Sequence, residues 1–170
     1  MTLSNPVLDA IRGRRSIRDY KRGAVSHEEL EAVVDAGRLA PSAMNEQVWE
    51  FVVVTRPAVL KEIARLAPEN GPFIADAAAC IVVAGARTHR SIYLDGAAAV
   101  ENMLLAVHSM GLASCWVQAM DKDYSRPIAD LLGIPERCVL VAMLPVGAPA
   151  SAGDSPSKRP LESVLHWERF

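Results

Sequence analysis

Aromatic residues and net charge are scarce in this sequence, and each shortage excludes a class of protein. Phe, Trp and Tyr make up 5% of the 170 residues, and the formal net charge at pH 7 is -2. A weakly acidic chain with few rings for base stacking is not expected to be a dedicated nucleic-acid binder. An interaction protein built on a basic patch is disfavoured for the same reason.

Cysteine is also rare. The three cysteines, Cys80, Cys115 and Cys138, form no CxxC pair, and Cys80 and Cys138 lie in apolar runs. A thiol in such a run usually behaves as a small buried hydrophobe. We therefore expect free thiols and no metal cofactor, with a disulfide or a metal site as the less favoured alternatives.

Long apolar runs are missing as well. The alanine-rich run 74–86 comes closest to a membrane span, but Asp76 interrupts it and it is too short. The segment 1–11 lacks the basic and then apolar order of a signal peptide, and no GxGxxG dinucleotide motif occurs. We therefore expect a cytoplasmic protein without a membrane or nucleic-acid partner.

The residues that are abundant suit a folded domain, because 51% are hydrophobic and 22% charged. Helical spacing predicts helices at 6–13, from Ser26 to before Pro41, from Pro57 through Leu66, at 95–110 and at 124–132. Ser26 and Glu29 form a capping box, and Asp95 is expected to cap the helix after it. Strands are predicted at 51–55, 79–84, 113–118 and 138–146. This alternation predicts one α/β or α+β domain with a mixed sheet over residues 1–170.

A basic stretch between the first two predicted helices is the first candidate site. It contains Arg14, Arg15, Ser16 and Arg18. Guanidinium groups offer forks of donors that match phosphate oxygens, and a serine hydroxyl adds another donor. The stretch could clamp one phosphate group, and the alternative is a solvated run of surface charge.

The loop after the second predicted helix is the other candidate site. Pro41 stops the helix, and Asn45 and Gln47 each carry donors and acceptors. Such a loop could bind the polar edge of a planar heterocycle. The alternative is an ordinary connection between a helix and a strand.

Five segments taken together resemble the FMN-dependent nitroreductase family. They are RRSIRDY (14–20), APSAMNEQVWEFVVV (40–54), GLASCWVQA (111–119), LPVGAPA (144–150) and KRPLESVLHWERF (158–170). They cover nearly the whole chain in order. The resemblance implies an α+β, nitroreductase-like three-layer sandwich. In it, helices flank a mixed, mainly antiparallel sheet, and a C-terminal segment is exchanged in a homodimer.

The resemblance also implies the role of individual residues around FMN. The phosphate and ribityl chain would be held by Arg14, Arg15, Ser16 and Arg18, with Arg14 or Arg18 near the N1–O2 edge of the ring. The partner subunit would contribute Pro41, Ser42, Ala43, Asn45 and Gln47. The backbone near N5 would come from Val117, Gln118 and Ala119. C-terminal contacts to the phosphate would come from Gly147, Lys158 and Arg159, with Arg159 preferred of the basic pair.

Some positions depart from the family pattern. Val48 replaces a proline, Ala148 replaces a tyrosine, and the segment 87–95 leaves little room for the helical excursion of longer relatives. We therefore expect a more open active site.

The implied activity is an FMN-dependent NAD(P)H oxidoreductase. NADH or NADPH and then a small acceptor, such as a nitroaromatic or a quinone, would react in turn at one flavin. The flavin carries the redox chemistry in such a site, so no catalytic side chain is required. Two alternatives remain open: a flavin-binding or storage protein without nicotinamide turnover, and a relative that reduces enones, removes halogens or fragments flavin.

Overall fold

The fold is organised around one antiparallel sheet. The computed structural model describes residues 3–170, so the first two residues of the predicted domain lie outside the described residues. Within that range the sheet has six strands: β1 (Tyr20–Lys21), β2 (Trp49–Val54), β3 (Ala79–Ala86), β4 (Ala113–Ser114), β5 (Val117–Gln118) and β6 (Cys138–Pro149). The order is β1-β6-β3-β2, and β4 and β5 also pair with β6. The single parallel pairing in this range is an isolated bridge between Ser16 and Ser114.

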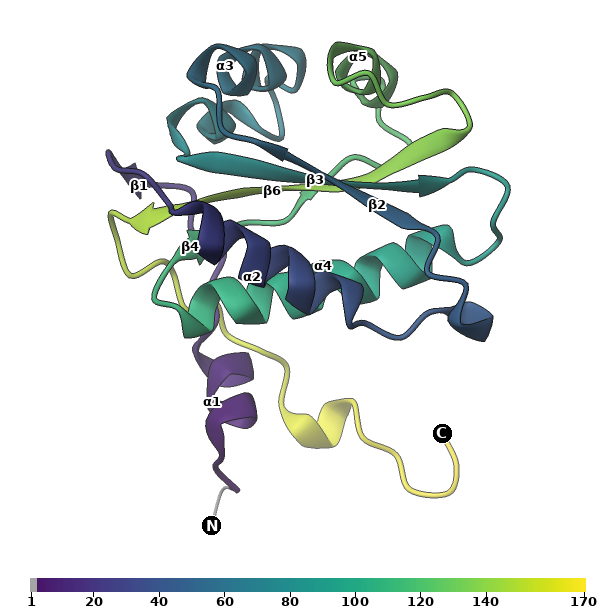
Figure 1. Ribbon diagram of the computed structural model, residues 1–170. Helices are drawn as coiled ribbons and strands as arrows, with labels where there is room; N and C mark the ends of the chain where they lie inside the picture. The colour runs from purple at the N-terminus through teal and green to yellow at the C-terminus, as the bar shows by residue number, and fades with distance from the viewer. Residues whose placement is uncertain (1–2) are drawn as a thin grey trace.

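Helices cover both faces of this sheet, which gives three layers (Figure 1). One face carries α3 (Pro57–Leu66) and α5 (Ser125–Leu131), and the other carries α2 (His27–Arg38) and α4 (Ile92–Ser109). Strand β3 is buried along nearly its whole length because both of its faces are covered. Its side chains alternate between two apolar cores, with Val82 in the core under α3 and α5, and Val83 in the core over α2 and α4. The predicted three-layer α+β fold is therefore confirmed.

The predicted helix starts are confirmed at two helices. In α1 (Pro6–Gly13) the side chain of Asn5 accepts a hydrogen bond from Leu8 N. In α2 the capping box of Ser26 and Glu29 is complete. Both devices act within three positions of the chain, so the local sequence is sufficient to predict them.

The predicted start of α4 is wrong, because the helix begins at Ile92 and not after Asp95. The Asp95 carboxylate caps no N–H of its own helix. Instead it accepts the backbone N–H of Ala43, 52 positions earlier, at 3.2 Å with each oxygen.

The strand predicted at 113–118 is interrupted. Cys115 and Trp116 separate β4 from β5. Ser16 forms a parallel bridge with Ser114, the last residue of β4. Strand β6 also runs further than predicted, to Pro149, because it is the shared partner of β1, β3, β4 and β5.

Two segments project from the three layers (Figure 1). One is α1, with Val7 65% exposed, and the other is the C-terminal tail after Ala150, with Trp167 79% exposed. The tail holds one short 3-10 helix, Leu161–Ser163, and the other 3-10 helices are Ala43–Asn45 and Pro72–Asp76. In residues 3–170 no helix is both long enough and apolar enough to span a bilayer.

Candidate functional site

The arginine segment lies between α1 and β1 and is held against the sheet by its backbone. The N–H of Ile17 donates to the carbonyl of Ser114 at 3.0 Å, in the bridge that joins Ser16 to β4. The segment continues into β1, where Tyr20 pairs with Pro149 of β6. The basic side chains are therefore carried on ordered backbone and are not a loose surface run.

A cavity of about 720 Å³ opens over this segment. Its lining residues come from both ends of the chain and are mostly basic: Ile11, Arg12, Arg14, Arg15, Ser16, Arg18, Asp154, Pro156 and Lys158. The two segments are in direct contact, since a guanidinium nitrogen of Arg15 donates to Ser155 Oγ at 3.0 Å. This is a concave, cationic site of the size of small-molecule cofactor pockets.

Two polar groups near the arginine segment are not fully used by the described residues. The Arg14 guanidinium lies 3.8 Å from the Glu101 carboxylate, a long contact for an ion pair. The hydroxyl of Ser114 is buried and has no hydrogen-bond partner among the described residues. A buried donor without a partner is unfavourable, and this hydroxyl belongs to the residue that pairs with Ser16.

Cys115 lies close to the same arginines. Burial raises the pKa of its thiol above the ordinary value, although Arg18, Ser16 and Arg14 act in the opposite direction. The net direction is upward, so the thiol stays protonated and unreactive at neutral pH. All three cysteines are free and buried, as expected.

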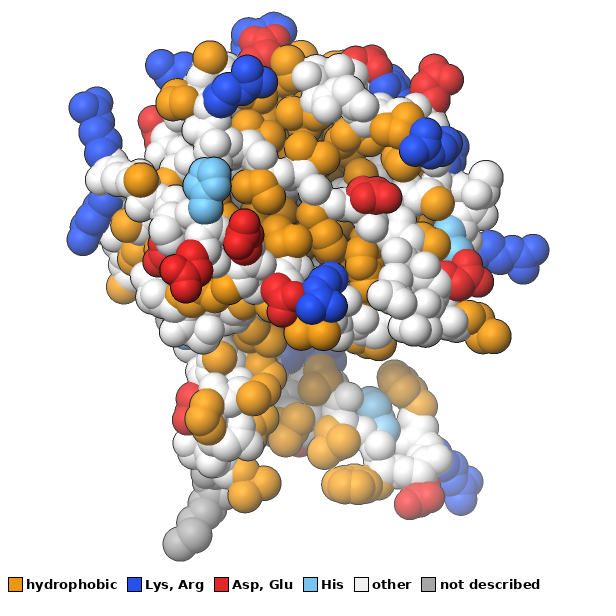
Figure 2. Space-filling model, viewed as in Figure 1, with side chains coloured by type: hydrophobic (Ala, Val, Ile, Leu, Met, Phe, Trp, Pro, Cys, Tyr) orange, Lys and Arg blue, Asp and Glu red, His pale blue; other side chains and the backbone are white. Residues whose placement is uncertain are grey.

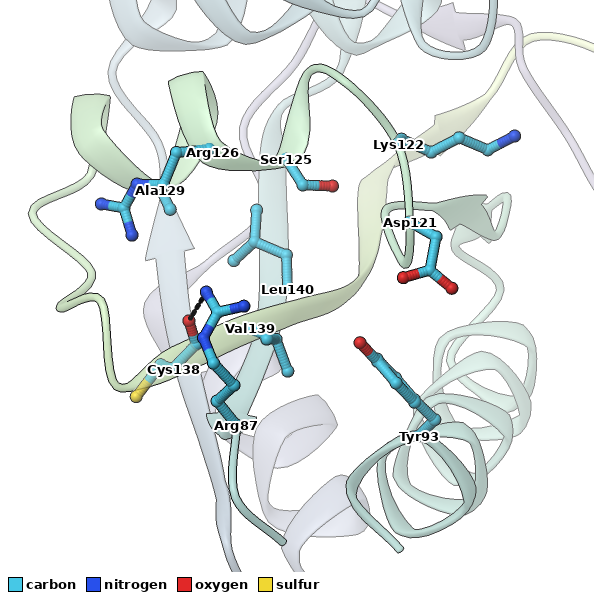
Figure 3. Close-up of a pocket in the computed structure, with 10 residues that line it drawn as sticks. All are labelled: Arg87, Tyr93, Asp121, Lys122, Ser125, Arg126, Ala129, Cys138, Val139 and Leu140. Atoms are coloured by element: carbon cyan, nitrogen blue, oxygen red, sulfur yellow. Dashed lines mark hydrogen bonds between the residues drawn. The ribbon is translucent and has the colours of Figure 1, made fainter. Parts of the chain in front are cut away.

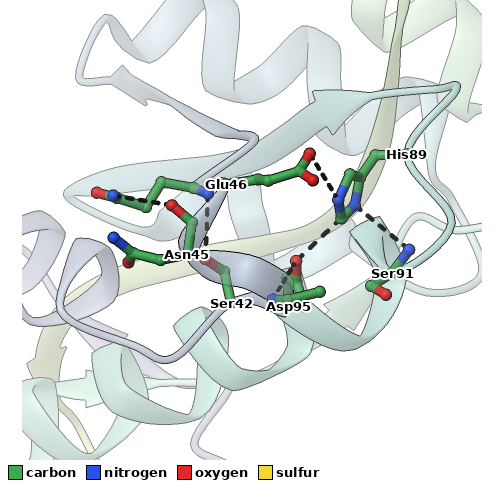
Figure 4. A network of polar contacts seen from close by, with 8 residues as sticks. Ser42, Asn45, Glu46, His89, Ser91 and Asp95 are labelled. Atoms are coloured by element: carbon green, nitrogen blue, oxygen red, sulfur yellow. Dashed lines mark hydrogen bonds and ion pairs between the residues drawn. The ribbon is translucent and has the colours of Figure 1, made fainter.

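The loop 41–47 lies at the other end of α4. Met44, Asn45 and Gln47 have left-handed backbone, with φ of 54°, 58° and 50°. Hydrogen bonds hold this shape, because Gln47 N donates to Ser42 Oγ at 3.1 Å and Ala43 N donates to Asp95 (Figure 4). The side chains of Asn45 and Gln47 are exposed, and their outward faces are available to a ligand or to another protein chain.

One subunit does not bring the two candidate segments together. Ser16 pairs just beyond the C-terminal end of α4, while Ala43 binds in its first turn. The helix has 18 residues, which corresponds to a length of about 27 Å. No residue of 41–47 lines the cationic cavity.

The predicted backbone near the ring lies on β5 and just after it. Val117 and Ala119 are buried and Gln118 is exposed. The carbonyls of Gln118 and Ala119 accept hydrogen bonds from the hydroxyls of Tyr124 and Ser125. These contacts fix the turn that follows β5.

The predicted C-terminal residues are placed differently from one another. Lys158 lines the cavity, whereas Arg159 donates to the carbonyl of Ser163 at 2.6 Å within the tail. Gly147 is buried, and a Cβ on it would lie 2.9 Å from the ring of Tyr20. Packing therefore explains this glycine without a ligand.

A second, smaller cavity of about 180 Å³ lies between α5, the start of α4 and β6 (Figure 3). Arg87, Tyr93 and Asp121 are among its lining residues, and none of the predicted site residues is. The Arg87 guanidinium donates to the carbonyls of Glu136 and Cys138, at 3.0 and 3.3 Å. Its volume is below the usual range for cofactor pockets, so this cavity does not suit a ring-sized ligand.

Sequence reasoning missed the groups that shape the loop. Asp95 was expected to be a helix cap, and His89 carried no prediction, yet both lie in the network of Figure 4. Ser114 was also missed. No local pattern indicates these roles, because the partners of Asp95 and Ser114 are far away in the chain.

Known proteins resemble this chain in sequence and in structure. A family model described as the Nitroreductase family matches residues 11–71 and 65–148. A Methanothermobacter thermautotrophicus protein, provisionally named NADH dehydrogenase/NAD(P)H nitroreductase, is 34% identical over 171 residues. The match covers 96% of this chain and 87% of that protein.

Two solved structures are similar over their whole length. A Bacteroides thetaiotaomicron protein with the same provisional name has a TM-score of 0.92 and 32% identity, with coverage of 99% of this chain and 100% of that chain. A provisionally named nitroreductase from Desulfovibrio desulfuricans, solved in complex with FMN, has a TM-score of 0.80 and 34% identity. That match covers 99% of each chain.

Proposed function

The chain belongs to the nitroreductase family, and on that premise we propose that it is an FMN-dependent oxidoreductase. It takes electrons from NADH or NADPH and passes them to a small acceptor such as a nitroaromatic or a quinone. Residues 1–170 then form one cytoplasmic FMN-binding domain.

The observation that carries the proposal is the cationic cavity. Four basic residues of the predicted site line it: Arg14, Arg15, Arg18 and Lys158. Arginine forks and an ammonium group are the donors that proteins use for phosphate. Ser16, which also lines the cavity, adds a hydroxyl. The donor set therefore fits the phosphate and polyol ends of FMN.

When bound, FMN would supply the redox chemistry that carries electrons from a nicotinamide to the acceptor. The residues of the chain bind and orient it. The guanidinium of Arg14 or Arg18 would provide positive charge for the N1–O2 edge of the ring. The backbone of 117–119, held by Tyr124 and Ser125, would lie near the ring.

Two segments would form a cradle for the flavin: the arginine segment of one subunit and the loop 41–47 of a second copy of the chain. Because 41–47 and the cationic cavity lie at opposite ends of α4, we assign the loop to the flavin of the partner subunit. The exposed Met44, at 91%, is then covered by the partner.

An apolar groove beside an edge strand fits the tail of the second copy. Strand β2 is at one edge of the sheet, and Leu30, Val34 and Val53 line a groove of about 380 Å³ between it and α2. Figure 2 shows exposed apolar side chains gathered in the middle of this face. The tail presents exposed Val164, Trp167 and Phe170. An open strand edge and an apolar extended segment are the two parts of strand addition.

The visible spectrum of the purified protein, before and after anaerobic NADH or NADPH, tests the function. We expect a flavin spectrum that bleaches with one or both nicotinamides and recovers when a nitroaromatic or a quinone is added. A flavin spectrum that no nicotinamide bleaches indicates a storage protein. A protein that takes up no FMN from excess cofactor contradicts the proposal. Enones and halogenated aromatics, added as acceptors, distinguish the other reductions.

A further inference from the structure

The loop 42–47 has a backbone that needs external support. Three of its residues that are not glycine, Met44, Asn45 and Gln47, have left-handed φ values. Side chains with a Cβ adopt this conformation only where the surroundings stabilise it. Within the loop, Asn45 N donates to the carbonyl of Ser42 at 3.0 Å and Gln47 Nε2 donates to the carbonyl of Asn45 at 3.2 Å. These bonds shape the loop but do not attach it to the rest of the fold.

The attachment is made by Asp95, in the first turn of α4. Its side chain is 7% exposed, and both carboxylate oxygens lie 3.2 Å from Ala43 N. A buried carboxylate is unfavourable unless donors surround it. The positive end of the α4 dipole also favours this charge. The acceptor capacity of Asp95 is directed at the loop and not at its own helix.

His89 lies between the same carboxylate and Glu46, at the far end of the loop (Figure 4). Its Nδ1 accepts the N–H of Ser91 at 3.3 Å and lies 3.9 Å from Asp95 Oδ2. Its Nε2 lies 3.2 Å from a carboxylate oxygen of Glu46. The loop is thus attached at Ala43 and at Glu46, on either side of two left-handed residues.

We infer that Asp95, together with His89, is a positioning residue for the flavin of the partner subunit, since it holds the 42–47 loop in the one shape that presents Asn45 and Gln47 outward. The inference rests on the proposed function. A buried acid of one chain would thereby control cofactor affinity at a site that the other chain shares.

The test measures FMN affinity and loop conformation in Asp95→Ala and Asp95→Asn variants. We expect the FMN dissociation constant to rise about tenfold or more in Asp95→Ala, in line with the loss of a hydrogen bond to a charged acceptor. Asp95→Asn keeps one acceptor oxygen, so its FMN dissociation constant should lie between those of Asp95→Ala and the wild type. The visible spectrum of residual bound flavin should shift, and amide NMR signals of residues 43–47 should move in the flavin-free protein. Asp130→Asn, which removes an exposed acid of α5 paired with Arg126, serves as the matched control.

The outcomes separate the two ideas. If the wild type takes up no FMN, the proposed function fails and the inference fails with it. If the wild type binds FMN and Asp95→Ala binds it with the same affinity and spectrum, the inference alone is overturned, even when the thermal midpoint falls. Should Asp95→Ala not fold, Asp95→Asn decides by the same measurements, and unchanged affinity together with unchanged amide signals overturns the inference.

Discussion

Ser16 and Ser114 are joined by an isolated parallel bridge, in which the N–H of Ile17 donates to the carbonyl of Ser114 at 3.0 Å. This contact attaches the arginine segment to the strand that follows the central helix. It places the hydroxyl of Ser16 at the rim of the cationic cavity, beside a buried serine whose own hydroxyl is unpartnered among the described residues. The contact thus joins two sequence motifs nearly a hundred residues apart, of which the arginine segment lines one wall of the cavity.

Removing donors from this wall should release the cofactor. In the double variant Arg14→Ala/Ser16→Ala, we expect FMN affinity to fall about 100-fold, because two hydrogen bonds to a charged phosphate are lost. Fluorescence of released FMN measures this. Arg65→Ala, which removes an exposed arginine of α3 paired with Glu62, is the matched control. Full flavin occupancy in the double variant would show that the phosphate assignment is wrong.

Mixed dimers test whether the site is shared between subunits. One subunit carries Arg14→Ala/Ser16→Ala and the other carries Asn45→Gly/Gln47→Gly, since glycine keeps left-handed φ without strain at both positions. We expect neither parent dimer to retain FMN, while the mixed dimer, isolated with two affinity tags, regains half of the wild-type content. A mixed dimer that binds no better than its parents indicates that both segments serve the same subunit.

The two basic residues at the start of the tail should contribute unequally to FMN binding. Lys158 lines the cavity, while Arg159 is bound to the carbonyl of Ser163. We expect Lys158→Ala to weaken FMN binding about tenfold and Arg159→Ala to weaken it much less. Titration of the flavin-free variants with FMN measures both. The reverse order would support the preference for Arg159 that the family resemblance suggested.

A substitution at Gly147 tests whether this residue is required for packing or for cofactor binding. In Gly147→Ala the added Cβ would lie 2.9 Å from Cδ1 of Tyr20, and we expect a loss of about 1–3 kcal/mol in the free energy of unfolding. Gly23→Ala is the control, because a Cβ there meets nothing within 4 Å. Urea denaturation of the flavin-free protein measures the difference. If stability is unchanged and FMN is lost, Gly147 belongs to the cofactor site instead.

The capping box of α2 should contribute stability that depends on pH. Hydrogen bonds from the side chain and the backbone of Ser26 hold the pKa of Glu29 below its ordinary value of 4.5. A depressed folded-state pKa contributes stability that is present above the unfolded value and is lost as pH falls through the folded value. The difference in unfolding free energy between the wild type and Glu29→Gln should therefore be constant near neutral pH and shrink below about pH 4.5. Glu28→Gln removes a neighbouring charge and leaves the box intact, and an equal pH dependence in that control would contradict the assignment.

Local rules predicted the parts of this fold whose partners are close in sequence. The helix predicted at 6–13 has these bounds, and Ser26 and Glu29 form their box. The start of α4 could not be predicted in this way. An aspartate in the first turn of a helix has the pattern of a cap, and that pattern does not reveal that a distant loop binds the carboxylate instead.

By itself, the sequence determined the order of helices and strands, the basic and amide-bearing segments, and a resemblance strong enough to name a family and a cofactor. These follow from residue type and short-range spacing, which local hydrogen bonds and side-chain shape control. Only the tertiary structure decided that Ser114 meets Ser16, that Tyr20 occupies the space beside Gly147, that Asp95 holds Ala43, and that the two halves of the candidate cradle lie at opposite ends of α4. Each of these depends on packing between residues far apart in the chain, and local propensity does not specify which distant group becomes the partner.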